Sequence, residues 1–157
     1  HTIEALLGLD LPVLVVTGHR AVELESMIRR SYPAVKFVRN STYQLGMYSS
    51  VRSGLSCIDR ASDALILPAD MPLITKKHIE PLLEQWTSND VLRPRCEGIP
   101  GHPVLVSSLI AQASAAAPDL QSMQQLVQKY PITYVETKDR AYITDADTPQ
   151  EYRHLLS

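Results

Sequence analysis

Short apolar runs alternate with amphipathic stretches along the whole chain, and this alternation limits the possible folds more than any other feature. The run Val13–Thr17 is rich in β-branched residues, which predicts a strand buried on both faces. Arg20–Arg30 then spaces its apolar residues among charges, as an amphipathic helix does. Strands alternating with helices indicate an α/β domain with a mainly parallel sheet.

The rest of the chain continues the pattern. Further strands are predicted at 35–38, 63–67, 91–93, 104–106, 132–135 and 142–143, and further helices at 49–58, 76–86, 107–116, 119–129 and 149–156. Ser49 or Ser50, Thr75 and Thr148 are suited to cap helix starts, with Pro149 at the first position of the last helix. No repeat or linker interrupts the pattern, so we expect one domain, residues 1–157.

Composition excludes several classes of function. The chain has 157 residues, with 15 Lys and Arg against 17 Asp and Glu, giving a net charge of −2. Such a chain has no overall field for binding nucleic acid or an anionic membrane. Charge, Pro or Gly interrupts every long apolar stretch, so no segment is expected to span a bilayer. Cys57 and Cys96 have no metal-site spacing, and no segment resembles a secretory signal, which predicts a reducing, cytoplasmic setting.

Ligands of open α/β sheets collect at the carboxyl ends of the strands. In this chain, that rule points to Gly18-His19, Asn40, Ala69-Asp70 and residues 98–102. The sharpest candidate is Asp70, which an apolar strand delivers between two prolines. It can be a plain helix cap, but Thr75 is the better cap, which leaves Asp70 free. A lone carboxylate beside a phosphate site commonly holds Mg²⁺.

A second acidic cluster, Asp145 and Asp147, precedes the last predicted helix. Its plainer interpretation is an ordinary acidic helix start with Asp147 or Thr148 as the cap. A structural role for one carboxylate leaves the other available for a metal. Two acidic clusters at distant strand ends could therefore converge on one cation.

Two further segments suit ligand contact. In Gly98–Pro103, two glycines allow close backbone approach and prolines hold His102, although loop histidines are more often structural. In Gly46–Leu55, a helix start with small residues and Arg52 one turn in makes an anion or nucleotide site. The alternative for that segment is a well-capped helix with a solvated arginine. His19 has a weaker case than His102.

Taken in order, the motifs resemble the molybdenum-cofactor nucleotidyltransferases of the GT-A-like, MobA-type NTP-transferase superfamily, especially its cytidylyltransferase branch. Five segments carry the resemblance and together run along nearly the whole chain. They are Val-Val-Thr-Gly-His (15–19), Gly-Met-Tyr-Ser-Ser-Val-Arg-Ser-Gly-Leu (46–55), Pro-Ala-Asp-Met-Pro-Leu (68–73), Gly-Ile-Pro-Gly-His-Pro-Val-Leu (98–105) and Asp-Ala-Asp-Thr-Pro (145–149).

The resemblance implies a Rossmann-like, three-layer α/β/α fold and transfer of CMP from CTP to molybdopterin with release of pyrophosphate. It implies Mg²⁺ held by Asp70, with Asp145 or Asp147 as the second contributor. It places the Ser49–Arg52 helix start near the nucleotide, and Gly101 and His102 toward the pterin. We therefore expect Asp70, Arg52 and His102 to be catalytic. The expected ligand-binding set is Gly18, His19, Asn40, Gly46, Ser49, Ser50, Gly101 and His102. Molybdoenzymes or their chaperones are further candidate partners.

Two departures from the family keep other hypotheses open. The chain does not contain the first strand and glycine-rich phosphate loop with which the family begins, so we expect an open sheet edge and no activity from these residues alone. Residues 119–123 also differ from the family's usual Gly-Asp-rich turn. The alternatives are a non-catalytic module that binds the cofactor or a partner, and a transferase with another substrate pair, such as GTP with molybdopterin or a sugar phosphate acceptor.

Overall fold

The computed structural model describes residues 1–87, 90–117 and 122–157. The chain divides into two compact units, and each is built from separate segments of the sequence. The first unit comprises residues 1–11, 65–106 and 131–157; the second comprises 12–64 and 107–130. Whether they form the single domain expected from the sequence stays a prediction, and each unit is described by itself.

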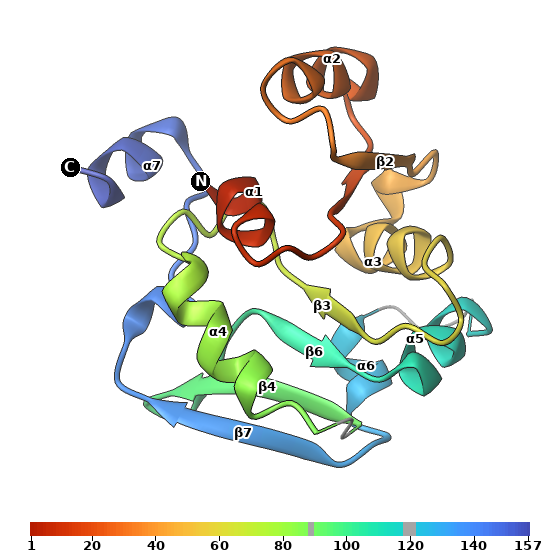
Figure 1. Ribbon diagram of the computed structural model, residues 1–157, viewed down its shortest axis with the longest axis vertical. Coiled ribbons are helices and arrows are strands. Elements are labelled where there is room, and N and C mark those ends of the chain that lie inside the picture. Colours follow the sequence, from red (N-terminus) through yellow and green to blue (C-terminus); the bar gives the residue numbers. More distant parts are fainter. Residues whose placement is uncertain (88–89, 118–121) are drawn as a thin grey trace. The chain divides into compact units, whose positions relative to one another are not determined.

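The first unit is a mixed β-sheet with helices (Figure 1). Its strands are β3 (Ala64–Ile66), β4 (Val91–Cys96), β5 (Ile99–Pro100), β6 (Val104–Val106) and β7 (Ile132–Thr137). Its helices are α1 (Thr2–Leu7), α4 (Lys76–Glu84), α7 (Pro149–Leu155) and the 3₁₀ helix η2 (Arg140–Ile143). The order β3-β6-β4-β5, with β7 also pairing β4, places β4 at the centre. The core lies where α4 covers this sheet, with Ile79 and Leu82 packed among Leu92 and Leu105.

The expectation of a mainly parallel sheet is wrong for this unit. β4 runs parallel to β7 but antiparallel to both β5 and β6. The reason is the length of the connection between β4 and β6. A parallel crossover needs a dozen or more residues and usually a helix, whereas here the chain turns at Glu97-Gly98, both with positive φ, and pairs back through β5.

The second unit contains a parallel strand pair and five helices among the described residues. The elements are β1 (Leu14–Thr17), α2 (Ala21–Ser31), β2 (Lys36–Arg39), the 3₁₀ helix η1 (Tyr43–Leu45), α3 (Met47–Leu55), α5 (Ser108–Ala115) and α6 (Met123–Val127). Of the β1 residues only Thr17 is buried, so the prediction of a strand buried on both faces is wrong. Within the described chain β1 pairs with β2 alone, and the expected open sheet edge is present here.

Two element predictions need further correction. Residues 142–143 belong to η2 and not to a strand, because Asp139 Oδ1 accepts from the Ala141 amide and starts a 3₁₀ turn. Neither Ser49 nor Ser50 is the helix cap, since α3 begins after Gly46, whose φ of 95° suits only glycine well. The predicted helix 119–129 and the atypical segment 119–123 lie partly outside the described residues, and α6 begins at Met123.

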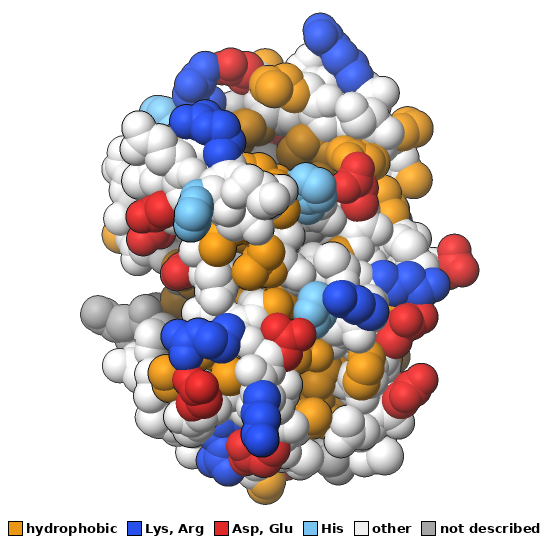
Figure 2. All heavy atoms as spheres, turned by 90° about the vertical axis from the view of Figure 1, so that its left-hand side faces the viewer, with side chains coloured by type: hydrophobic (Ala, Val, Ile, Leu, Met, Phe, Trp, Pro, Cys, Tyr) orange, Lys and Arg blue, Asp and Glu red, His pale blue; other side chains and the backbone are white. Residues whose placement is uncertain are grey.

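On the face drawn in Figure 2, acidic and basic side chains are intermixed and form no large patch of a single charge. Several charged side chains of the described residues form ion pairs, as in Arg20–Glu23 and Arg140–Glu97. Among the described residues, no helix is both long and apolar enough to span a bilayer.

Candidate functional site

Asp70 lies in the loop that follows β3 in the first unit, and one of its carboxylate oxygens has an unusual environment. Oδ1 is sealed from solvent yet has no hydrogen-bond partner. A buried carboxylate oxygen without a donor is costly, so this atom is suited to a cation that the chain itself does not supply. The side chain is not used as a helix cap, because Thr75 fills that role for α4.

The second acidic cluster is joined to Asp70 through the backbone. The Ala146 amide donates to the Asp70 carbonyl oxygen at 2.8 Å. Asp145 and Asp147 flank Ala146, and both side chains are exposed. The structure therefore brings together two segments that are 75 positions apart in the printed numbering, from Asp70 to Asp145.

Gly101 and His102 form the next part of this region. The His102 amide donates to the Tyr142 carbonyl oxygen at 2.8 Å, and the Gly101 amide donates to Pro94 at 2.8 Å. A Cβ at position 101 would lie 2.4 Å from the Tyr142 oxygen, so only glycine fits against that backbone. Main-chain hydrogen bonds of these two adjacent residues thus hold the loop to β4 through Gly101 and to η2 through His102.

His102 is neutral at physiological pH. The pKa of its imidazole is lowered to about 4, mainly by burial and then by the charge of Arg93, while Asp145 acts in the opposite direction. Nδ1 is sealed and has no hydrogen-bond partner. A neutral imidazole carries one donor and one acceptor nitrogen, so the ring can exchange a hydrogen bond with a substrate without a change of charge.

The remaining predicted residues belong to the second unit. Asn40 is buried and its amide is fully used: Nδ2 donates to Ser49 Oγ at 2.8 Å and Ser50 Oγ at 3.0 Å, and Oδ1 accepts twice from Thr42. Asn40 therefore anchors the start of α3, and it has no spare polar group for a ligand. Arg52 lies one turn further along that helix and is half-buried.

Gly18 and His19 follow β1 in the same unit. A Cβ at position 18 would lie 2.6 Å from Tyr43 Cβ, so glycine is needed for Tyr43 to pack there. His19 is exposed, with its ring 6.1 Å from that of Tyr43. The contact with Tyr43 therefore gives Gly18 a structural role.

The model of the MobA-like NTP transferase domain matches residues 1–137. The chain belongs to this family. The first sequence expectation, a relationship to the molybdenum-cofactor nucleotidyltransferases, is confirmed, and the family and its relatives are nucleotidyltransferases.

One curated relative of this MobA-like domain is the molybdenum cofactor cytidylyltransferase of Escherichia coli K12. It is 26% identical over 142 residues, which are 89% of this chain and 71% of the relative. Among solved structures, 4-diphosphocytidyl-2C-methyl-D-erythritol synthase from Anaerococcus prevotii matches with a TM-score of 0.79 at 12% identity, covering 99% of this chain and 87% of that one.

A third similar protein, Rv0371c of Mycobacterium tuberculosis, was crystallised as a complex with manganese. It matches with a TM-score of 0.72 at 16% identity, covering 97% of this chain and 83% of that one. At such identities the solved structures establish the fold alone. They confirm the α/β nucleotidyltransferase fold predicted for this chain. The expectation of a mainly parallel sheet is not met, as described above.

The donor set of the MobA-like domain suits a cation that needs few protein ligands. Among the described residues, no group of three or more His, Cys, Asp or Glu side chains is placed to hold a metal. Mg²⁺ usually keeps several waters and takes only one or two carboxylates together with substrate phosphates. The unpartnered Asp70 Oδ1, with Asp145 and Asp147 on the adjoining segment, fits that requirement.

Sequence reasoning missed two residues of these regions. Glu25 is buried on α2, accepts from Thr17 Oγ1 at 2.9 Å, and binds both Nε and Nη2 of Arg39. Hydrogen bonding to Arg39, more than any other contact, lowers the pKa of Glu25 to about 2. This carboxylate ties the ends of β1 and β2 together just before Gly18 and Asn40. The second missed residue is Arg93, whose partners also lie on other segments.

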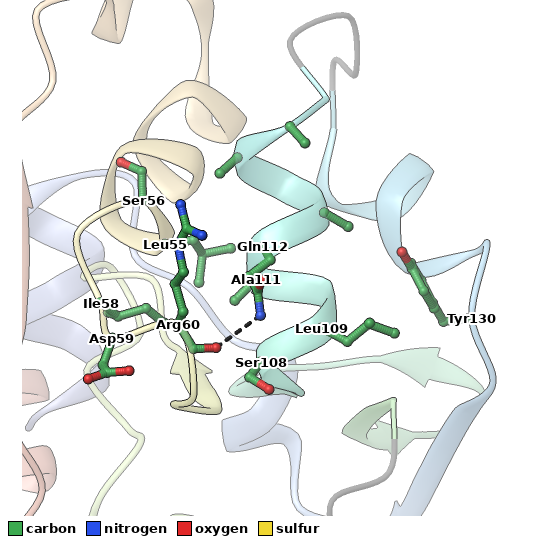
Figure 3. A pocket seen from close by; sticks show the side chains of 13 residues that line it. Leu55, Ser56, Ile58, Asp59, Arg60, Ser108, Leu109, Ala111, Gln112 and Tyr130 are labelled. Atoms are coloured by element: carbon green, nitrogen blue, oxygen red, sulfur yellow. Dashed lines mark hydrogen bonds between the residues drawn. The ribbon is translucent and has the colours of Figure 1, made fainter.

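A cavity of about 690 Å³ lies elsewhere in the second unit (Figure 3). It opens between the residues after α3 and the exposed side of α5, where Gln112 Nε2 donates to the Arg60 carbonyl oxygen at 3.0 Å. Leu109 and Tyr130 line it as well. None of the residues predicted from the sequence as binding or catalytic lines this cavity.

Proposed function

We propose that this MobA-like domain transfers CMP from CTP to molybdopterin. An oxygen of the acceptor's terminal phosphate forms a bond to the α-phosphorus of CTP, the bond from that phosphorus to the bridging oxygen breaks, and pyrophosphate leaves. The observation that carries the proposal is the sealed, unpartnered Asp70 Oδ1, on a residue whose backbone carbonyl accepts from the amide of Ala146, between Asp145 and Asp147. The cytidylyltransferase activity named for the E. coli relative supports the choice of CTP.

Asp70 is the proposed ligand of Mg²⁺, with Asp145 or Asp147 as the second contributor. When bound, the cation would neutralise charge on the transferring phosphate and orient it. His102 stays neutral and is proposed to face the pterin, beside the backbone of Gly101. Proximity and positioning account for most of the rate enhancement in such a reaction, and little covalent work is left for side chains.

For the nucleotide, the proposed contacts lie in the second unit. They are the start of α3, with Gly46, Ser49, Ser50 and Arg52, and the loop residues Gly18 and His19. The amides at the start of a helix suit phosphate oxygens. Asn40 acts here through Ser49 and Ser50, since its own amide is fully occupied.

The experiment compares Asp70→Asn with wild type in two assays. In protein that also carries the first strand and glycine-rich phosphate loop of the family, we expect wild type to release pyrophosphate from CTP and molybdopterin only with Mg²⁺ or Mn²⁺, and the variant to lose on the order of 100-fold in rate. Mn²⁺ binding, followed by electron paramagnetic resonance with CTP present, is expected to weaken in parallel. Asp10→Asn, at an exposed position of the same unit, is the matched control and should match wild type in both assays.

Two results would count against the proposal. Wild-type turnover that is equal with and without a divalent cation would remove the role of Asp70. Tight molybdopterin binding without CTP affinity or turnover would favour the non-catalytic alternative, and a panel of acceptors in which a sugar phosphate reacts faster would move the acceptor to another class.

A further inference from the structure

Arg93 lies in the middle of β4, and its guanidinium is directed at the loop that carries His102. It is half-buried between the buried residues Leu92 and Pro94. Nε and Nη2 both donate to the Gly101 carbonyl oxygen, at 3.1 and 2.8 Å. A full positive charge is therefore fixed one residue from the imidazole of His102.

No carboxylate neutralises this charge among the described residues. Burial is the main influence on Arg93 and lowers the pKa of the guanidinium, and the only opposing influence is Tyr134. Arg95, two positions along the same strand, contrasts with it: that guanidinium pairs with Glu136 and lies over the Tyr134 ring. Burying a cation without a counter-charge is unfavourable, so Arg93 is electrostatically suited to an anion from outside the chain.

The guanidinium also has donors to spare. Arginine carries five N–H donors, and Gly101 engages only Nε and Nη2. Within the described part of the chain, Nη1 has no partner, and it is not among the nitrogens sealed from solvent. It can therefore be reached by a ligand, and the planar fork of arginine matches phosphate oxygens better than lysine does.

The surroundings of Arg93 identify the kind of anion. Both Arg93 and Asp145 act electrostatically on His102, and the Asp145 segment is joined to Asp70 by the Ala146 amide. The hydrogen bonds agree: Arg93 holds the Gly101 carbonyl, and the next residue, His102, donates to Tyr142, three positions before Asp145. The guanidinium and the carboxylates thus lie on adjoining segments of the first unit. We propose that Arg93 binds the phosphate monoester of the acceptor substrate, an assignment that rests on the proposed function of this site.

The alternative is a purely structural arginine that tethers β4 to the Gly101 loop. Arg93→Gln distinguishes anion binding from this structural role, because glutamine keeps a donor for the Gly101 carbonyl but removes the positive charge. Arg93→Lys keeps the charge and loses the fork. Arg95→Gln removes the same charge two residues away and is the matched control. Phenyl phosphate and inorganic phosphate, titrated while amide chemical shifts are recorded, are the probes.

We expect wild type and Arg95→Gln to bind phenyl phosphate equally. Arg93→Gln should bind it at least 10-fold more weakly, and Arg93→Lys should lie between. In the transfer reaction, Arg93→Gln should raise the acceptor KM by the same factor and leave the CTP KM unchanged. Equal phenyl phosphate affinity in Arg93→Gln and wild type, or an equal loss in Arg95→Gln, would overturn the assignment.

A second measurement needs no variant and so does not depend on folding of Arg93→Gln. Phenylglyoxal modifies accessible arginines, and mass spectrometry follows Arg93 and Arg95 in the same sample. Phenyl phosphate should slow modification of Arg93 and leave Arg95 unaffected; equal rates at Arg93 with and without it would contradict the proposal. Protection of Arg93 in a protein that shows no transfer would uphold this anion site and overturn the proposed reaction alone.

Discussion

Gly101 is the residue whose side chain the structure most clearly forbids. In Gly101→Ala, the new Cβ would lie 2.4 Å from the Tyr142 carbonyl oxygen and 3.0 Å from its carbon, both backbone atoms that cannot turn aside. We expect a loss of roughly 1–3 kcal/mol in the free energy of unfolding, the range of overpacked sites, measured by urea denaturation.

Gly8→Ala is the control for that substitution. Its nearest contacts would be at 3.4 Å and its φ is −66°, so alanine fits there without strain. It should leave stability unchanged within about 0.5 kcal/mol or raise it slightly. Equal stability of the two variants would show that the loop at Gly101 relaxes away from Tyr142.

The buried imidazole of His102 makes stability depend on pH in one direction. Its folded pKa of about 4 lies below the ordinary 6.5, so the unfolded chain takes up a proton first as the pH falls. This contribution to stability is complete above pH 6.5 and is lost progressively between pH 6.5 and about 4. In urea unfolding, wild type should lose stability more steeply across this range than His102→Gln.

Parallel pH curves for the two proteins would contradict that expectation. Glu25 does not confuse the comparison, because hydrogen bonding to Arg39 depresses the pKa of this carboxyl to about 2. Its contribution is present above about pH 4.5 and is lost only below that value, and it is common to both proteins.

At the scale of single residues, sequence motifs reveal candidate functional residues that lie together in one short segment. They miss residues whose partners lie far away in the sequence. Asp70, Gly101 and His102 stand out because each lies in a short segment of prolines and glycines. Arg93 and Glu25 do not stand out. Arg93 finds its partner across a turn, and Glu25 finds its partners on two strands, so no local spacing signals either role.

The stability of the last helix, α7, depends mainly on the hydrogen bonds that cap it, because none of its residues is buried. Its capping box joins the Glu151 amide to Thr148 Oγ1 at 3.2 Å and the Thr148 amide to Glu151 Oε2 at 2.9 Å. Thr148→Ala should destabilise the helix by about 1 kcal/mol. Amide hydrogen exchange within α7 should then quicken roughly fivefold.

The thermal midpoint should hardly change in Thr148→Ala, because α7 opens locally. Gln150→Ala, an exposed position in the same helix, is the matched control and should not quicken exchange. A large fall in the thermal midpoint without faster exchange in α7 would mean that the helix is coupled to the core after all.

Helices and strands are predictable where the residues that start or end them lie next to them in the sequence. Thr75 and Thr148 were predicted to cap helices and both do so, each within a capping box. The start of α3 was not predictable, because it depends on a positive φ at Gly46 and not on a side-chain cap. The prediction of a mainly parallel sheet fails at β6, because the connection from β4, residues 97–103, has no room for the helix of a parallel crossover.

At the scale of the whole molecule, net charge and unpaired strand edges together determine how readily copies of the chain associate. The net charge is −2 and the isoelectric point is near 6.2, so repulsion between copies vanishes near that pH. In the described chain β1 and β3 each pair on one side only, and an unpaired edge favours association. Light scattering should therefore rise near pH 6.2 and fall at pH 8; equal scattering at both would contradict this.

No feature of the sequence predicts the division of the chain into two units. Each unit combines segments that are distant along the chain, and no linker marks the points where the chain passes from one to the other. Alternation of strands and helices reveals which elements form, but their assignment to a unit depends on long-range packing, such as that of Leu92 on Leu82.

The parallel pairing of β4 with β7 has a consequence for synthesis in the cell. Arg95 and Glu136, which are partners across these strands, are 41 positions apart. At a translation rate of about 5–20 residues per second, β4 leaves the ribosome seconds before its neighbour exists. During that interval Val91 and Leu92 lie on a nascent strand with one edge vacant, which is where a chaperone acting on this chain would have most to protect.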